Sequence, residues 1–244
     1  MIDSVRRTVL SILNKNNYGY ISPADFNLYA KQAQLDIFDD YFKDYNYQVN
    51  KENARQSGTG YADIKKGYEE VIDGLSETNF LTQDAANSFF LPSTTTTGDD
   101  YYLVNKVLCY SGSGAFLGEA ERVTHSKITM LNNSLLTSPT EKFPAYVQNG
   151  SKITVFPNTI NTANQVEVQY IRYPKDPKWT YSTLANGEPV FNQSQADYQD
   201  FELSIDDEVD LVVKILQYAG MSIREVQAVQ FGKAEEQLNT QEKK

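Results

Sequence analysis

The first part of the chain, up to about residue 75, carries apolar residues at the spacing of amphipathic helices. The strongest start signal is Ser22, because Pro23 follows at the first helical position and Asp25 stands in capping-box position. We expect this helix to reach about Tyr45 and to be followed by a polar loop at 50–60. Three helices are predicted here from their apolar residues. The first has Val5, Val9, Ile12 and Leu13; the second, which starts at Ser22, has Phe26, Tyr29, Ala30, Ala33, Ile37 and Tyr41; and the third, over 62–75, has Ile64, Tyr68, Val71, Ile72 and Leu75.

From about residue 79 to 201 the pattern changes to short apolar runs separated by turn residues, which predicts strands. Apolar and polar residues alternate in 166–170, as is typical of a half-buried antiparallel strand. Asn149 and Gly150 lie between two such runs and predict a hairpin with a type I′ turn. We expect a Thr-rich, acidic, mobile loop at 94–100 and a short helix within 126–136. The clearest strands are predicted at 88–91, 101–110, 152–156 and 165–173.

After about residue 205 apolar residues again occur at the spacing of an amphipathic helix. The acidic run 206–208 complements the positive end of a helix dipole, so a helix should begin there and end at Gly220. Ser222, with Glu225 three residues later, forms a second capping box and predicts one more helix.

This order of elements predicts an α+β fold. We expect residues 1–78 and 204–244 to form a helical bundle and residues 79–203 to form an inserted, antiparallel β-rich lobe. The composition, 40% hydrophobic and 12% aromatic, is typical of an ordered protein. Its 17 Tyr against one Trp are notable, because tyrosine suits surfaces that are wet in a free subunit and buried in an assembly.

The net charge of −10 disfavours a general nucleic-acid binder, which needs clustered cations. The basic pairs Arg6-Arg7, Lys65-Lys66 and Lys243-Lys244 are interpreted as solvated helix faces or chain ends. An acidic wall would instead suit a channel along which DNA slides without sticking. The single Cys109 cannot form an intramolecular disulfide and should be buried. We expect no secretory leader and no transmembrane helix, and therefore synthesis in a reducing cytoplasm.

The candidate chemical motifs are weak, and we expect no catalytic, cofactor-binding or metal-binding residues. Segment 14–25 resembles a calcium loop flanked by helices, but Asp25 is its only carboxylate, which favours a plain helix-turn-helix. His125 is the only histidine, and its polar neighbours favour a solvated or capping role. The stretch 111–118 is Gly-rich but lacks the Lys-Ser/Thr ending of a phosphate loop, which favours a turn.

Two further groups could carry chemistry. Acidic residues occur close together at 39–40, 99–100, 119–121 and 206–207, and we interpret them as solubility and capping residues, because no His or Cys accompanies them. The Tyr-rich stretch 41–47 could stack on bases, but Lys43 is its only cation, so a helix-end core or a subunit contact is favoured.

Both ends of the chain resemble known proteins. Val9–Asn16, Gly19–Pro23 and Phe26–Gln34 look like the N-terminus of ring proteins in the tails of crAss-like podoviruses. Glu202–Ser204, Glu208–Gly220 and Ile223–Glu225 resemble the C-terminal helices of such subunits.

The resemblance implies a structural virion protein rather than an enzyme, namely a subunit of the head-to-tail connector. Such a subunit would form a closed ring, commonly a twelvefold dodecamer, with itself, and would contact the portal protein and neighbouring tail rings. DNA would pass through the channel without sequence-specific binding, and the ring would be assembled in the host cytoplasm. The alternatives are a muzzle, cargo or fibre-attachment component of the virion, and a carboxylate-dependent hydrolase.

Overall fold

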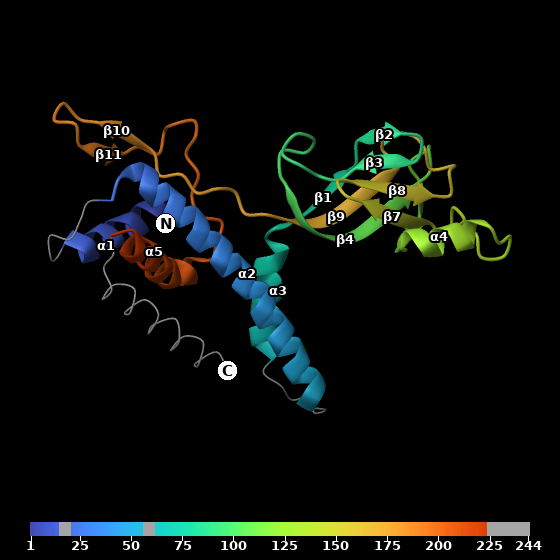
Figure 1. Ribbon diagram of the computed structural model, residues 1–244, viewed down its shortest axis with the longest axis horizontal. Helices are drawn as coiled ribbons and strands as arrows, with labels where there is room; N and C mark the ends of the chain where they lie inside the picture. Colours follow the sequence, from blue (N-terminus) through green and yellow to red (C-terminus); the bar gives the residue numbers. More distant parts are fainter. Residues whose placement is uncertain (15–20, 56–61, 224–244) are drawn as a thin grey trace. The chain divides into compact units, whose positions relative to one another are not determined.

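The computed structural model describes residues 1–14, 21–55 and 62–223, and these form two compact units (Figure 1). Unit 1 contains the described parts of 1–71 and 174–244, and unit 2 spans 72–173. Helices dominate unit 1 and strands dominate unit 2, so the predicted α+β class is confirmed.

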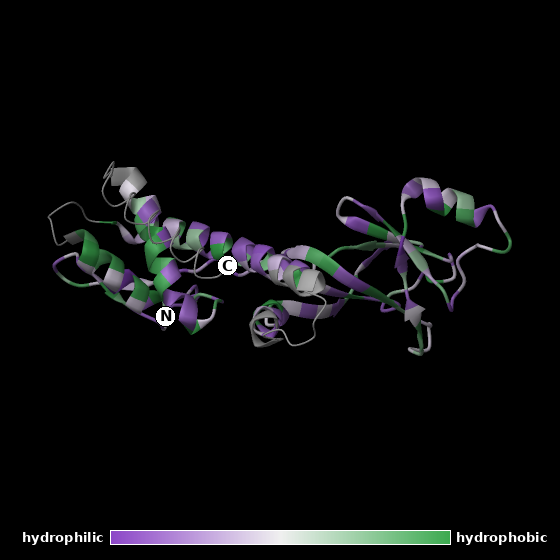
Figure 2. Cartoon of the chain, turned by 90° about the horizontal axis from the view of Figure 1, so that it is seen from below, coloured by the Kyte–Doolittle hydropathy of each residue, from purple (hydrophilic) through white to green (hydrophobic). Residues whose placement is uncertain are grey.

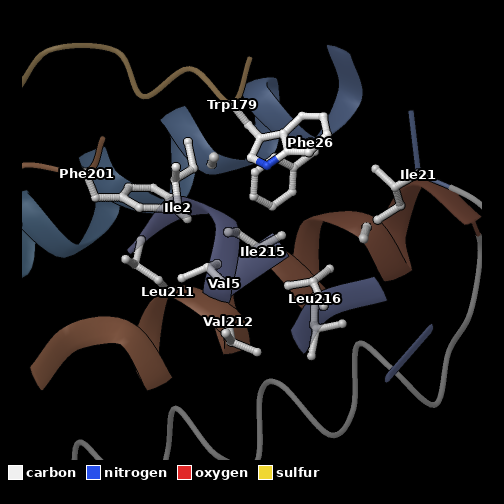
Figure 3. Close-up of a cluster of buried hydrophobic side chains, with 14 of the residues drawn as sticks. Ile2, Val5, Ile21, Phe26, Trp179, Phe201, Leu211, Val212, Ile215 and Leu216 are labelled. Carbon is white, nitrogen blue, oxygen red and sulfur yellow. The ribbon is translucent and has the colours of Figure 1, made fainter. Parts of the chain in front are cut away.

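Unit 1 is built around three helices that share one apolar core: α1 (Ile2–Asn14), α2 (Pro23–Arg55) and α5 (Glu208–Ile223). The side chains of Ile2, Phe26 and Leu211, one from each helix, are almost completely buried, and Figure 3 shows them converging. The sequence forms this core because each helix carries apolar residues on one face. Unit 1 also contains most of α3 (Ala62–Asp73), the hairpin strands β10 (Tyr181–Thr183) and β11 (Pro189–Phe191), and the short 3-10 helix η1 (Ile205–Asp207).

The predicted start of α2 is confirmed, but its predicted end is wrong. The Asp25 amide donates to Ser22 Oγ at 3.1 Å, and Ser22 Oγ donates to the Asp25 carboxylate at 2.6 Å. The helix continues to Arg55, through the first part of the loop expected at 50–60. The reason is local: no Gly or Pro interrupts the chain between Tyr45 and Arg55.

The C-terminal helix α5 also runs further than predicted. It continues through Gly220 to Ile223, so Ser222 lies inside this helix. A glycine inside a helix costs only about 1 kcal/mol relative to alanine, and the buried Leu216 and Ala219 fix this part of the helix in the core. The further helix predicted after Ser222 lies outside the described residues.

The division between the units differs from the predicted boundaries. Residues 174–203 were expected in the β-rich lobe, but they belong to unit 1. The Gln34 side chain of α2 binds both ends of this segment, the Lys175 carbonyl at 2.8 Å and the Glu202 amide at 3.1 Å. The segment also inserts Trp179 into the helical core. These are contacts distant in sequence, which local patterns do not reveal.

Unit 2 consists of two sheets packed face to face. One has the order β1 (Ser76–Phe80), β9 (Val166–Arg172), β4 (Tyr101–Tyr110), β5 (Phe116–Glu119). The other has the order β2 (Gln83–Ala85), β3 (Ser88–Phe90), β8 (Lys152–Phe156), β7 (Ala145–Asn149), β6 (Glu121–Arg122). All the pairings are antiparallel except β6 with β7. Val107 and Val168 from the first sheet meet Phe89 and Ile153 from the second in one buried core.

The predicted hairpin at 149–150 exists, but its turn is of another type. Asn149 pairs with Lys152, so the two central residues are Gly150 and Ser151. Gly150 has a φ of 55°, and Ser151 is not among the described residues with positive φ. Glycine at the first central position is the signature of a type II′ turn, which matches the twist of the strands as well as type I′ does. The short helix predicted within 126–136 is α4 (His125–Asn132).

Candidate assembly surfaces

The most exposed apolar side chains of unit 2 lie in and after α4. We call Met130, Leu135, Leu136 and Phe143 the apolar tip; their exposed fractions are 74, 102, 97 and 72%. Figure 2 shows apolar residues in the loop that follows this helix. Large apolar side chains that are exposed within one short segment favour an interaction surface, because water solvates them poorly.

Local structure explains why the apolar tip points outward. Thr124 caps α4 by accepting a hydrogen bond from the Lys127 amide. The helix buries Ile128 against Val123, Ala145 and Val147, which leaves its other faces open. Backbone hydrogen bonds then shape the chain up to β7: Ser138 donates to Ser134 at 3.0 Å, and Phe143 donates to Thr140 at 3.0 Å. The exposed Lys142 lies at the tip, with its Nζ 6.0 Å from the centroid of the Phe143 ring.

Unit 2 also contains a hollow of about 770 Å³ with aromatic walls. We call it the aromatic hollow. Its apolar and aromatic lining residues are Phe90, Leu91, Pro92, Tyr101, Tyr102 and Tyr173, and its polar lining residues are Ser93, Thr95, Thr96, Asp100 and Ser151. The Tyr102 and Tyr173 rings meet edge to face, with centroids 5.1 Å apart. The Gln148 amide donates to the Tyr101 hydroxyl at 3.3 Å. The walls are therefore positioned by their own contacts and present apolar surface with polar groups at the margin.

The Thr-rich loop expected at 94–100 forms the rim of this hollow. Its residues hydrogen-bond to one another: Asp100 Oδ1 accepts from the Thr94 amide at 2.8 Å and from the Thr94 hydroxyl at 3.1 Å. The Tyr173 amide donates to the Asp100 carbonyl at 3.0 Å, which joins the loop to the end of β9. The exposed Asp100 thus places a negative charge beside an aromatic surface.

A second aromatic cluster lies in unit 1 around the buried Trp179. The Arg6 guanidinium carbon lies 3.8 Å from the centroid of the Trp179 ring, and the rings of Tyr181 and Phe191 stack on it at 5.6 and 5.9 Å. Arg6 is buried, so its interpretation as a solvated residue is wrong. A guanidinium can leave water when it lies over an indole, because the ring face attracts the cation. The cluster is therefore structural and anchors the β10–β11 hairpin.

The weak chemical motifs fall into structural roles. In the segment that resembles a calcium loop, Asp25 belongs to the cap of α2, and residues 15–20 lie outside the described ranges. His125 is the exposed first residue of α4. The Gly-rich stretch 111–118 includes the turn between β4 and β5, in which the Ser111 amide donates to the Ala115 carbonyl at 2.7 Å. Within the described ranges no three His, Cys, Asp or Glu residues are grouped to hold a metal.

Each group of neighbouring acidic residues has a member that binds a partner within the fold. Asp40 pairs with Lys43 at 2.9 Å and with Lys214 at 3.0 Å. Partial burial raises the pKa of Asp40, but hydrogen bonds and charge from these two lysines outweigh it and leave the pKa below its usual value. In unit 2, Glu121 pairs with Lys127 at 3.2 Å. None of these contacts gathers carboxylates around an open cavity in the described part of the chain.

Tyr41 and Tyr45 of the Tyr-rich stretch 41–47 bind residues of other helical elements. Tyr41 lies in the core and donates its hydroxyl to Asp207, and burial together with this bond raises the pKa of Tyr41. Tyr45 donates to Glu69 at 3.1 Å, whereas Tyr47 is exposed. Cys109 is completely buried, as expected, and burial raises the pKa of its thiol to about 12.

No protein-family model matches the chain, and no curated protein matches it. No helix in the described ranges is long and apolar enough to cross a membrane. The surfaces found here therefore rest on the geometry alone. Sequence reasoning missed both the apolar tip and the aromatic hollow. The adjacent pair Leu135-Leu136 in a turn-rich stretch was the available signal for the tip.

Proposed function

We propose that this protein is a ring-forming structural subunit of the head-to-tail connector of a tailed bacteriophage. In this role it joins the portal to the tail and surrounds the channel through which DNA passes. It acts as a structural component and not as an enzyme.

The observation that carries the proposal is the presence, on unit 2, of two different surfaces suited to burial in an assembly. The side chains of the apolar tip are at least 72% exposed, and the aromatic hollow is concave. A closed ring requires such a pair, because each subunit meets its two neighbours through different surfaces. A twofold dimer would instead use one surface twice.

Two further observations support the proposal. The segments that resemble ring proteins stand at opposite ends of the sequence. Their described parts cover the second half of α1 (9–14), part of the start of α2 (26–34) and most of α5 (208–220), and all three contribute residues to one core. Sequence similarity at both ends then corresponds to one folded unit. The net charge of −10 also suits a channel that DNA crosses without binding, since like charges repel.

The test is assembly of the purified chain, alone and with portal protein, measured by light scattering and by averaging negative-stain images. We expect closed rings with a central opening, formed either alone or on the portal, and twelvefold averages. A monodisperse monomer under both conditions overturns the proposal. Binding to fibre or muzzle proteins without ring formation favours one of those virion roles instead.

A further inference from the structure

The apolar tip and the aromatic hollow lie at opposite ends of strand β7. The tip precedes this strand, since Phe143 stands two residues before its first residue, Ala145. The hollow lies beyond its last residue, Asn149, because the turn that follows contributes Ser151 to the lining. Five residues of strand span about 17 Å. In Figure 1, α4 and the loop between β3 and β4 lie at opposite ends of unit 2.

This separation excludes an intramolecular contact between the two surfaces. β7 is hydrogen-bonded along its length to β8, so the strand cannot fold back to bring its two ends together. The tip can enter a hollow of this kind only in another copy of the chain. The hollow, at about 770 Å³, is large enough for more than one side chain.

The two surfaces are complementary in polarity and charge. The tip offers aliphatic side chains, Leu135 and Leu136, and the hollow offers aromatic walls such as Tyr102 and Tyr173. The tip carries the exposed Lys142 beside the exposed Glu141, and the rim of the hollow carries the exposed Asp100, so Lys142 and Asp100 offer one pair of opposite charges. Opposite charges around an apolar contact favour the correct register between partners.

We propose that the apolar tip of one copy inserts into the aromatic hollow of the next, with Lys142 facing Asp100 across the contact. This inference rests on the proposed function and specifies the ring interface. The contact is heterologous, because the tip of each copy is used by one neighbour and its hollow by the other. Repetition of the contact generates a ring when the rotation between copies closes.

Disulfide crosslinking tests the contact directly. The single native cysteine, Cys109, is buried and does not interfere. The double variant Leu136→Cys, Thr95→Cys places one thiol on the tip and one on the rim of the hollow, both at exposed positions. Under mild oxidation we expect a ladder of covalent oligomers on non-reducing gels. The matched control Ser113→Cys, Thr95→Cys, with the first thiol on the β4–β5 turn, should give no ladder.

Charge exchange provides a second, independent measurement. Lys142→Asp should raise the concentration needed for half-maximal assembly by about tenfold, because two like charges then face each other. Combining it with Asp100→Lys should restore assembly towards that of the unmodified chain. The double variant is decisive, because a substitution that only distorts the rim of the hollow cannot restore assembly that Lys142→Asp has weakened.

The outcomes separate this inference from the proposed function. Rings that form without a crosslinked ladder overturn the tip-and-hollow contact and leave the connector role standing. Covalent products that stop at the dimer also overturn the contact, because they indicate a twofold interface. Absence of any assembly, alone or on the portal, overturns both. A ladder together with the charge rescue supports the contact.

Discussion

Replacement of Gln34 by leucine tests whether segment 174–203 depends on α2 for its position. Gln34 is buried, and its amide group makes two hydrogen bonds to the backbone of that segment. It donates to the Lys175 carbonyl at 2.8 Å and accepts from the Glu202 amide at 3.1 Å. Leucine has a similar size but can neither donate nor accept, so both backbone groups lose this partner.

The expected loss follows from the cost of burying polar groups without hydrogen bonds. Each group left without its partner costs about 1–3 kcal/mol, or about 2–6 kcal/mol for the two. Burial of the leucine side chain offsets about 2 kcal/mol of this. We therefore expect Gln34→Leu to lower the free energy of unfolding of unit 1 by about 0–4 kcal/mol, with a central value of about 2 kcal/mol.

The assay is urea denaturation followed by the fluorescence of Trp179, the only tryptophan in the sequence, which is buried in unit 1. The matched control is Gln32→Leu, which makes the same substitution two residues away on the same helix at an exposed position. The control should change stability by less than about 0.5 kcal/mol. Equal effects of the two substitutions, or no effect of either, would refute the role assigned to Gln34.

Three further predictions concern stability and reactivity. Ile153→Ala, in the core of unit 2, should lower the free energy of unfolding of this unit by about 2–5 kcal/mol, measured by denaturation followed by near-UV circular dichroism. Leu135→Ala, at the tip, should leave this free energy nearly unchanged. The pKa of Asp40 is lowered in the fold, so its carboxylate stabilises unit 1 fully above the unfolded pKa near 4, and this stabilisation is lost as the pH falls further. Asp40→Asn should therefore lower the free energy of unfolding of unit 1 at pH 7 but not at about pH 2. Cys109 should react with a thiol reagent only after unfolding, and rapid native labelling would contradict its burial.

The helices and many strands were predictable because their signals are local. The start of α2 depends on Ser22 and Asp25, three residues apart, and β9 was predicted from the alternation of apolar and polar residues over 166–170. The errors occurred where distant contacts decide the outcome. Gly220 would end an isolated helix, but packing of Leu216 and Ala219 in the core carries α5 past it.

The candidate surfaces were harder to predict than the elements. The aromatic hollow combines residues from the ends of β3, β4 and β9 with the β7–β8 turn, and no sequence window contains them all. The apolar tip lies in one segment, but leucines in a turn-rich stretch are equally compatible with burial. Only their exposure distinguishes a surface from a core.

The sequence by itself determined the α+β class, the positions of most elements, the burial of Cys109 and the absence of a recognisable catalytic motif. These depend on composition and on periodicities of a few residues. The tertiary structure decided that segment 174–203 belongs with the helices, that Arg6 is buried against Trp179, and that the tip and the hollow lie at opposite ends of β7. Each of these requires contacts between residues far apart in the chain, and such contacts are set by packing of the whole unit rather than by local preference.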